Sequence, residues 1–533
     1  MNATHLLLVA AVGLLLLGCN DGNSSDADAA PDSGVSGWDA VSVDAANAPD
    51  RTMVRIELSA DPGAALAKDP KAYELSSPNG ALAVTDVSYD AKGAVVVLTT
   101  EKQKLGVTYT ATIPGNGDGR SADFPAADTA SFYASDFTTM GQYTLAATRA
   151  AIGEHCVVYV EDGQVVNTAS DIVAYFDEKV EPTESAFFTA PPDKDGNNRI
   201  VLLALDGKGQ YGGYFDPTNT FSDAEAMAMW GTHSNEMEMI YVDALSAVDY
   251  YSLVIPHEYQ HLLYNFRHGT NAEYWAYHDE GLAECAAMAV NGENDYAVTF
   301  YSADYQGLIA KGLSLVNWTW GLYENYAVAY LFWTYVAGRM GGVDAYGDIF
   351  DLDIGRPDEV GAFLNARLGE GFAQVQLDEM IAIAVQAPQG DLGFNGLVEP
   401  GLLAHPHAPS GTDSLDLEPY AGAFFGLFAD TVDYPGTQGP DIVYAGVAAS
   451  GETDLAAPFS LGPGGLLVAL NGNQEWSSFP TEHSGPDLPA LKSASTRAPH
   501  GGLFVSPAWR DPPPLRRDAP GPVLAWRESM LAR

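Results

Sequence analysis

Basic residues are scarce in this chain of 533 residues, where 25 Lys and Arg stand against 70 Asp and Glu. The resulting net charge of −45 repels nucleic acids and anionic membranes, so a nucleic-acid-binding function is excluded. The same acidity fits a secreted protein that its carboxylates keep in solution. The composition is otherwise that of an ordinary globular protein, and the length predicts about three domains.

Cysteine is scarce as well, because the chain holds only Cys19, Cys156 and Cys285. Three cysteines allow one disulfide bond at most. If Cys19 carries a lipid, the other two form an even pair, which is either a disulfide or two buried free thiols. The sequence leaves both alternatives open, because it does not give the distance between the two side chains.

A long apolar run is also lacking, since the stretch from Leu6 to Leu17 is too short to span a bilayer as a stable helix. It predicts the core of a lipoprotein signal peptide over residues 1–18. With Gly18 and Cys19 it resembles the lipobox of bacterial lipoproteins, in which the cysteine is acylated, although no Lys or Arg precedes the run. Asn20, rather than Asp, follows the cysteine, so the resemblance implies an outer-membrane or cell-surface lipoprotein. Secretion without an anchor is the alternative.

The pattern along the rest of the chain predicts a multidomain protein. Residues 19–50 are rich in Asp, Ser, Gly and Ala, and we expect a disordered acidic tether. Short alternating runs over residues 51–140 predict a β-sandwich that resembles an immunoglobulin-like domain. Residues 145–395 predict an α+β domain with a helical C-terminal lobe, and residues 396–490 a small β-rich module. Residues 491–533 hold seven basic and three acidic residues with many prolines, and we expect a poorly ordered Pro/Arg-rich tail.

The residues suited to catalysis lie between positions 257 and 284. In His257-Glu258-x-x-His261 the histidines are four positions apart, so a helix presents both imidazoles on one face to a metal ion. Glu258 lies about 100° around the helix axis, where it can take a proton from metal-bound water without being a ligand. Glu280 follows His261 after 18 residues and is the candidate third ligand. Glu284 lies one turn after Glu280 and can orient a ligand histidine.

This spacing is similar to that of the gluzincin metallopeptidases, and thermolysin-like enzymes share the later carboxylate, matched by Glu284. The segments SNEMEMIYVD, HEYQHLLYNF, DEGLAE and NYAVAYLFWTY look most like the hyicolysin family of bacterial secreted metalloendopeptidases. The resemblance implies a thermolysin-like zincin fold and a Zn²⁺ ion held by His257, His261 and Glu280. It also implies hydrolysis of peptide bonds by water that Glu258 activates.

A donor for the developing oxyanion is needed besides the metal. Gluzincins commonly supply a Tyr or His from the downstream helical region, and the resemblance points to Tyr326 as a catalytic residue. Tyr323 and Tyr330 are rival candidates, and a packing role for Tyr326 is equally open. Pro256, directly before the first ligand, either starts the active-site helix or kinks it.

Several neighbouring features have both a functional and a structural interpretation. His268 and His278 are expected to be solvated or to support the site, because the ligand set is already complete. Asp193 and Asp195 in DKDGNN have calcium-like spacing but lack the full loop and its final Glu, so we favour a polar turn, with Ca²⁺ as a further candidate. We expect the segment 211–216 to be an edge strand that pairs with an extended substrate near Tyr214.

Together these features predict a surface-tethered zinc-dependent metalloendopeptidase that acts on proteins or peptides. It would have no nucleic-acid partner and would contact the membrane only through its lipid anchor; its oligomeric state is open. The alternatives are a zinc aminopeptidase and a non-catalytic surface-binding lipoprotein with a zincin domain. The aminopeptidase is disfavoured because its Gly-x-Met-Glu-Asn anchor is missing, and only Asn235-Glu236-Met237-Glu238 echoes it. The intact Glu258 argues against a non-catalytic domain.

Overall fold

The structure is a computed structural model. It describes residues 37–406 except 116–117, 140, 270–274, 320–321 and 354, and then 414–426, 432–434, 442–448, 453–454, 459–461, 464–472, 477–480 and 504–507. The signal peptide, Cys19 and most of the expected tether therefore lie outside the described residues. In the part that is described, no helix combines the length and the apolar character that crossing a membrane requires.

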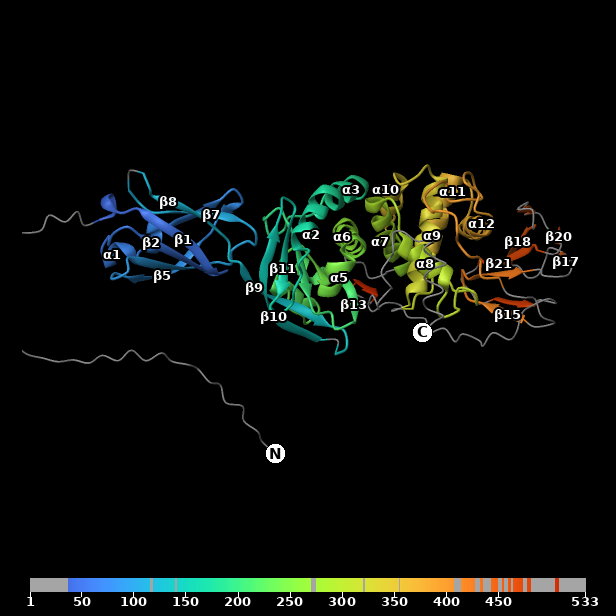
Figure 1. Cartoon of the computed structure of the whole chain (residues 1–533), viewed down its shortest axis with the longest axis horizontal. Helices are drawn as coiled ribbons and strands as arrows, with labels where there is room; N and C mark the ends of the chain where they lie inside the picture. Colours follow the sequence, from blue (N-terminus) through green and yellow to red (C-terminus); the bar gives the residue numbers. More distant parts are fainter. Residues whose placement is uncertain are drawn as a thin grey trace, which may run out of the picture.

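The N-terminal part is a sandwich of two four-stranded sheets with the orders β1-β2-β6-β5 and β4-β3-β7-β8 (Figure 1). Alternate residues of these strands, such as Val54, Ile56 and Leu58, form a hydrophobic core of their own, as a strand buried on one face requires. The elements are η1 Trp38–Ala40, β1 Val43–Asp50, β2 Met53–Leu58, α1 Ala64–Ala67, η2 Pro70–Ala72, β3 Glu74–Ser77, β4 Gly80–Ala81, β5 Val84–Asp90, β6 Val95–Thr100, β7 Thr108–Thr112 and β8 Ser121–Pro125.

Both expected ends of this domain differ from the structure. The tether was expected to reach residue 50, but β1 already pairs with β2, and Val41 and Val43 contribute to the sandwich core. Few large apolar residues mark this strand, which explains why the sequence pattern misses it. At the other end, strand β9, Thr129–Asp136, pairs with β10 of the next sheet rather than within the sandwich.

A mixed seven-stranded sheet follows, with the order β23-β13-β14-β12-β11-β10-β9. Strands β11, β12 and β14 run parallel to one another, whereas β13 is antiparallel to β14. Strands β11 and β12 are apolar on both faces, as buried parallel strands are. The elements are β10 Gly141–Ile152, β11 Cys156–Glu161, β12 Ile200–Leu205, β13 Tyr211–Phe215, β14 Met239–Asp243 and β23 Phe504–Pro507.

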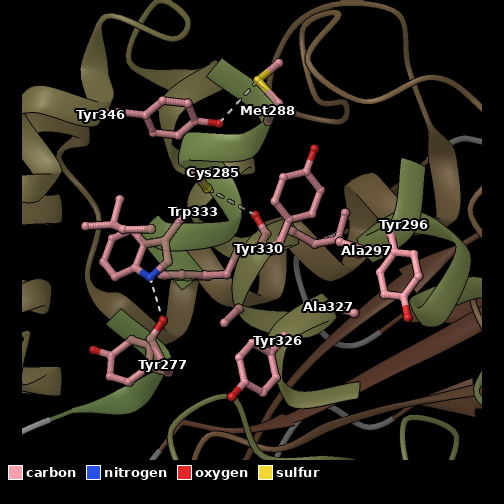
Figure 2. Packing of buried hydrophobic residues seen from close by; sticks show 14 of the residues in the cluster. Tyr277, Cys285, Met288, Tyr296, Ala297, Tyr326, Ala327, Tyr330, Trp333 and Tyr346 are labelled. Atoms are coloured by element: carbon pink, nitrogen blue, oxygen red, sulfur yellow. Dashed lines mark hydrogen bonds between the residues drawn. The ribbon is translucent and has the colours of Figure 1, made fainter. Parts of the chain in front are cut away.

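Helices cover one face of this sheet and then build a helical lobe (Figure 1). The first group is α2 Ala169–Tyr175, η3 Phe176–Val180, α3 Glu181–Phe187, η4 Pro217–Thr220, α4 Asp223–Met229, α5 Ala244–Asp249 and α6 Tyr251–His268. The lobe holds α7 Ala276–Asn291, α8 Asp295–Ala303, α9 Tyr323–Arg339, α10 Ala345–Phe350, α11 Pro357–Leu368 and α12 Phe372–Val385. Its centre is aromatic, and Figure 2 shows Tyr277, Tyr330 and Trp333 in the contact between α7 and α9.

The C-terminal strands form small antiparallel sheets beside α12 (Figure 1). Tyr420 and Phe424 belong to the same hydrophobic cluster as the helical lobe, so this module shares its core with the lobe. The strands are β15 Ser414–Leu417, β16 Gly422–Gly426, β17 Val432–Tyr434, β18 Ile442–Val447, β19 Thr453–Asp454, β20 Phe459–Leu461, β21 Leu466–Asn471 and β22 Ser477–Pro480.

The multidomain organisation with sheets and a helical region is thus confirmed. One segment of the expected C-terminal tail is ordered as a strand, because β23 at residues 504–507 pairs with β13. The rest of residues 491–533 lies outside the described part of the chain. The expected edge strand at 211–216 therefore carries a further strand on its outer side.

Candidate metal centre

Helix α6 carries the two histidines and begins at Tyr251, so Pro256 lies inside it rather than at its start. A proline in a helix leaves the carbonyl four residues earlier without its usual N–H donor. That carbonyl belongs to Ser252, and it accepts hydrogen bonds from the Tyr175 hydroxyl at 3.0 Å and from Asn291 Nδ2 at 2.8 Å. Side chains from two other helices thus compensate for the proline directly before the first histidine.

Helix α7 supplies the acidic residues and packs closely against α9. A Cβ at Gly281 would lie 2.6 Å from Trp333 Cδ1 and 3.0 Å from Ala329 Cβ, so a side chain there would push the two helices apart. Gly281 therefore lets α7 pack closely against α9, and in this position of α7 the neighbouring Glu280 faces α6. The contact is tied by Trp333 Nε1, which donates to the Tyr277 carbonyl at 2.9 Å (Figure 2).

The two histidines and Glu280 converge on one point. Glu280 Oε2 lies 3.2 Å from His257 Nε2 and 3.4 Å from His261 Nε2. In a tetrahedral zinc site, two ligand atoms at zinc-binding distance stand about 3.3 Å apart. Glu280 therefore has the spacing of a zinc ligand from each histidine, and the ligand atoms of all three side chains lie within 4.8 Å of one another. Two imidazoles with one carboxylate form a donor set that zinc accepts.

A carboxylate also contacts the far nitrogen of each imidazole. His257 Nδ1 lies 3.3 Å from Glu284 Oε1, and His261 Nδ1 lies 3.1 Å from Asp279 Oδ2. With a proton on each Nδ1, both outer carboxylates accept a hydrogen bond, and each Nε2 can then bind a metal ion at the point that it shares with Glu280. The outer carboxylates thus orient both rings for the tautomer that a metal ligand needs.

Glu284 is itself held in place by two donors. The Tyr323 hydroxyl donates to its Oε1 at 3.0 Å, and Asn294 Nδ2 donates to its Oε2 at 2.7 Å. The sequence predicts that Glu284 orients a ligand histidine. It does not predict the contact of Asp279 with His261 or the hydrogen bonds from Tyr323 and Asn294 to Glu284. Spacing could have pointed to Asp279, because it directly precedes Glu280 on the helix. Asn294 and Tyr323 come from separate elements, and no local pattern marks them.

The charges of the site balance one another. Burial lowers the pKa of His257, because it disfavours the charged imidazolium. Hydrogen bonds to Glu280 and Glu284 outweigh this effect, and the pKa of His257 is raised to about 9. Burial raises the pKa of Glu280, and the two nearby histidines more than reverse this, so the net shift is downward. The site therefore keeps Glu280 ionised in an interior position, where an anionic metal ligand is needed.

Glu258 lies on the same helix, buried between α6 and β13. A Cβ on Gly213 of β13 would come within 2.9 Å of Glu258 Cγ and 2.6 Å of Val254 Cγ1. The glycine thus brings the backbone of β13 directly against the carboxylate expected to act as general base. His257 is 3% exposed, and Glu258, His261 and Glu280 are fully buried.

Of the three tyrosines considered as oxyanion donors, Tyr326 lies next to the ligands. Its ring centroid is 6.2 Å from that of His257, and the charges of Glu280, Glu284 and Glu258 add to the effect of burial in raising its pKa. Tyr323 is engaged by Glu284, and the Tyr330 hydroxyl points away from that of Tyr326 in Figure 2.

The other two histidines considered near the site, His268 and His278, contact main-chain carbonyls and not the point where His257, His261 and Glu280 meet. His278 Nε2 donates to the Ile349 carbonyl at 3.1 Å, and His268 Nε2 donates to the Phe350 carbonyl at 2.7 Å. Burial lowers the pKa of His278 to about 4, so it is neutral. Both side chains connect the ligand helices to the region of α10.

A second acidic group forms where the calcium-like segment meets β14. Asp193, Asp195 and Glu238 place carboxylate oxygens within 4.8 Å of one another. Burial, and then the charge of Glu238, raise the pKa of Asp195 to about 7. In this turn the Asn198 N–H donates to Asp193 at 2.9 Å, as in a polar turn.

The two internal cysteines are free and buried, so the disulfide alternative is wrong. Cys156 lies on β11, whereas Cys285 lies on α7 with its Sγ 3.5 Å from Thr334 Oγ1. Burial raises the pKa of Cys285 to about 12, as is typical of an inert core thiol.

Comparison with known proteins relates the chain to a metalloprotease. No protein-family profile matches it. The neutral metalloprotease ShpI of Staphylococcus hyicus is 28% identical over 235 residues, covering 38% of this chain and 51% of the relative. The chain therefore matches about half the length of this curated relative.

Similarity to solved structures is slight. The N-terminal part of the bacterial S-layer protein SbsC covers 22% of this chain and 28% of that chain, with 18% identity and a TM-score of 0.16. The Group B Streptococcus pullulanase SAP covers 16% of this chain and 10% of that chain, with 12% identity and a TM-score of 0.14. At such scores these structures carry no argument about function.

Proposed function

We propose that this protein is a zinc-dependent metalloendopeptidase of the gluzincin type. The observation that carries the proposal is the convergence of His257 Nε2, His261 Nε2 and Glu280 Oε2 at zinc-ligand spacing. The distant relationship to a neutral metalloprotease supports the same chemistry. We further propose that the N-terminal sandwich is immunoglobulin-like and that the ligand helices belong to a thermolysin-like domain.

The side chains around the ligand point have separate tasks in peptide hydrolysis. His257, His261 and Glu280 would hold a zinc ion, which would supply a Lewis acid and lower the pKa of bound water. Glu258 accepts the proton of the attacking water and passes it to the leaving amine. Tyr326 donates a hydrogen bond to the developing oxyanion. Glu284 and Asp279 hold the imidazoles in the tautomer that leaves each Nε2 free to bind.

Cleavage inside a chain is favoured over trimming from an end. Of the residues that echo the aminopeptidase anchor, Glu236 pairs with Lys102 at 3.1 Å, and Glu238 accepts from the Lys194 N–H. Both glutamates therefore bind groups of this protein, and neither is left to bind the amino group of a substrate.

We also propose that the enzyme is held at the bacterial surface by a lipid on Cys19 and acts there on proteins or peptides. The support is the lipobox-like sequence at residues 16–19, together with the acidic composition. In Cys19→Ser, labelling with a fatty-acid probe and recovery with membranes should both be lost. Labelling and membrane recovery equal to those of the parent protein would refute the anchor.

Casein hydrolysis with and without a chelator, compared with hydrolysis of an aminoacyl anilide, tests the activity on the full chain. We expect one zinc ion per chain and casein cleavage that the chelator abolishes and added zinc restores. Preferential hydrolysis of the anilide would indicate an aminopeptidase. A proteolytic function would be refuted if the zinc-loaded protein cleaves neither substrate and the zinc-loaded double variant Val505→Pro with Ser506→Pro, which disrupts the strand at residues 504–507, cleaves neither as well.

A further inference from the structure

The outer edge of β13 is occupied by a segment from the far end of the chain. Strand β23 pairs with it antiparallel, with Tyr214 opposite Val505 and Phe215 opposite Phe504. Figure 1 draws this strand in red beside β13. Tyr211 lies opposite Pro507, so two residues of β13 face the single residue Ser506 and form a bulge. The bulge contains Gly213, the residue that packs against Glu258.

Strand β23 therefore pairs with the strand that packs against Glu258. It contacts α6 as well as β13, and α6 carries both histidines and Glu258. An extended polypeptide can bind an exposed sheet edge by adding a strand to it. Since β23 already uses the outer backbone groups of β13, a substrate strand and β23 cannot bind this edge at the same time.

The charge around β23 in the sequence fits binding to the rest of this protein. Residues 491–533 carry seven basic and three acidic residues, whereas the whole chain has a net charge of −45. Attraction between opposite charges favours association of such a segment with an acidic body, and salt weakens it. This attraction is independent of the backbone pairing and acts in the same direction.

We propose that residues 504–507 occupy the substrate edge as an internal pseudosubstrate strand and hold the enzyme latent. The proposal rests on the proposed function, because it assigns regulation to the same site. Activation then requires β23 to leave β13, either through cleavage of the chain ahead of residue 504 or through displacement by a substrate strand. No covalent change at the metal centre is involved.

The test disrupts β23 in the full-length, zinc-loaded protein. In the double variant Val505→Pro with Ser506→Pro, two successive N–H groups are lost, and in an extended strand one of them faces the partner. The matched control, Val523→Pro with Leu524→Pro, makes the same kind of change outside the strand. The readouts are kcat/KM on an internally quenched peptide, bound zinc, melting temperature and amide exchange across Tyr211–Phe215.

We expect the double variant to exchange the β13 amides faster and to raise kcat/KM about 10-fold or more, because a site open in one molecule in ten gains about that factor when it opens fully. The control should behave like the parent protein. A synthetic peptide of residues 497–517, which has four basic residues and one acidic residue, should inhibit the double variant competitively, and high salt should weaken that inhibition.

Three results would count against parts of this scheme. Faster exchange with unchanged or lower kcat/KM would show that β23 only protects a sheet edge. Unchanged exchange would show that β23 does not occupy β13. Faster exchange with bound zinc, but no cleavage by either protein, would refute the proteolytic function while supporting the docking of the strand.

Discussion

Replacing Gly213 by alanine tests whether β13 sets the position of Glu258. The added Cβ would lie 2.6 Å from Val254 Cγ1, 2.9 Å from Glu258 Cγ and 2.9 Å from the Tyr241 carbonyl oxygen, all inside normal contact distance. Overpacking of a tight core costs about 1–3 kcal/mol of the free energy of unfolding. Displacing a catalytic group by about 1 Å costs on the order of 10²-fold in rate. We therefore expect Gly213→Ala to lower kcat by roughly that factor and to lower stability modestly.

Bound zinc should be unchanged in Gly213→Ala, because the three atoms nearest to the new Cβ belong to Val254, Glu258 and Tyr241 and not to a metal-ligand side chain. The control is Gly361→Ala in α11, where the nearest contact of a Cβ is an ordinary 3.6 Å to Phe372. Alanine is the better helix former, so this variant should gain about 0.5–1 kcal/mol and keep full activity. Denaturant unfolding, zinc analysis and peptide cleavage on the same preparations provide the comparison. Normal kcat in Gly213→Ala would refute the claim that β13 positions Glu258.

The remaining predictions concern four buried carboxylates. Glu258→Gln should keep its zinc and lose cleavage by about 10²–10⁴-fold; zinc-loaded protein with near-normal cleavage would exclude the proposed base. Glu280→Ala should lose most of its zinc, whereas Glu284→Ala should bind it about 10–100-fold more weakly; equal losses in equilibrium dialysis would contradict these separate roles. Burial raises the pKa of Glu379 to about 8, so the folded state holds a proton that the unfolded state releases near its usual pKa of 4.5. The free energy of unfolding should therefore fall as the pH rises from about 4.5 to 8, by on the order of a few kcal/mol, and Glu379→Gln should remove this fall. The same dependence of the free energy of unfolding on pH in both proteins would contradict this prediction.

The ligand geometry could be predicted because it depends on local periodicity. His257 and His261 lie one turn apart on α6, and Glu280 and Glu284 lie one turn apart on α7. A helix fixes which side chains share a face, so these pairs follow from spacing alone. The approach of the two helices does not follow from spacing, since it depends on Gly281 packing against α9.

Features that depend on distant contacts could not be read from local patterns. The sequence places Pro256 before the first histidine, but only the fold shows that Tyr175 and Asn291 satisfy the carbonyl that the proline leaves. Likewise, composition suggests a disordered tail, whereas pairing of residues 504–507 depends on an edge nearly 300 positions earlier in the chain. Sequence separation of this size removes any local signal.

The core that the helical lobe shares with the C-terminal strands has a consequence for how the protein can be divided. Gln376 Nε2 of α12 donates to the Tyr420 carbonyl at 2.9 Å, and the ring centroids of Phe372 and Tyr420 are 4.7 Å apart. A fragment that stops at residue 395 would expose this apolar surface of α12 to water. Chimeras or expressed fragments with a boundary at residue 395 should therefore be prone to aggregation. A fragment that ends after β22 keeps the contact between α12 and Tyr420. The lobe and the C-terminal strands should therefore unfold as a single cooperative unit.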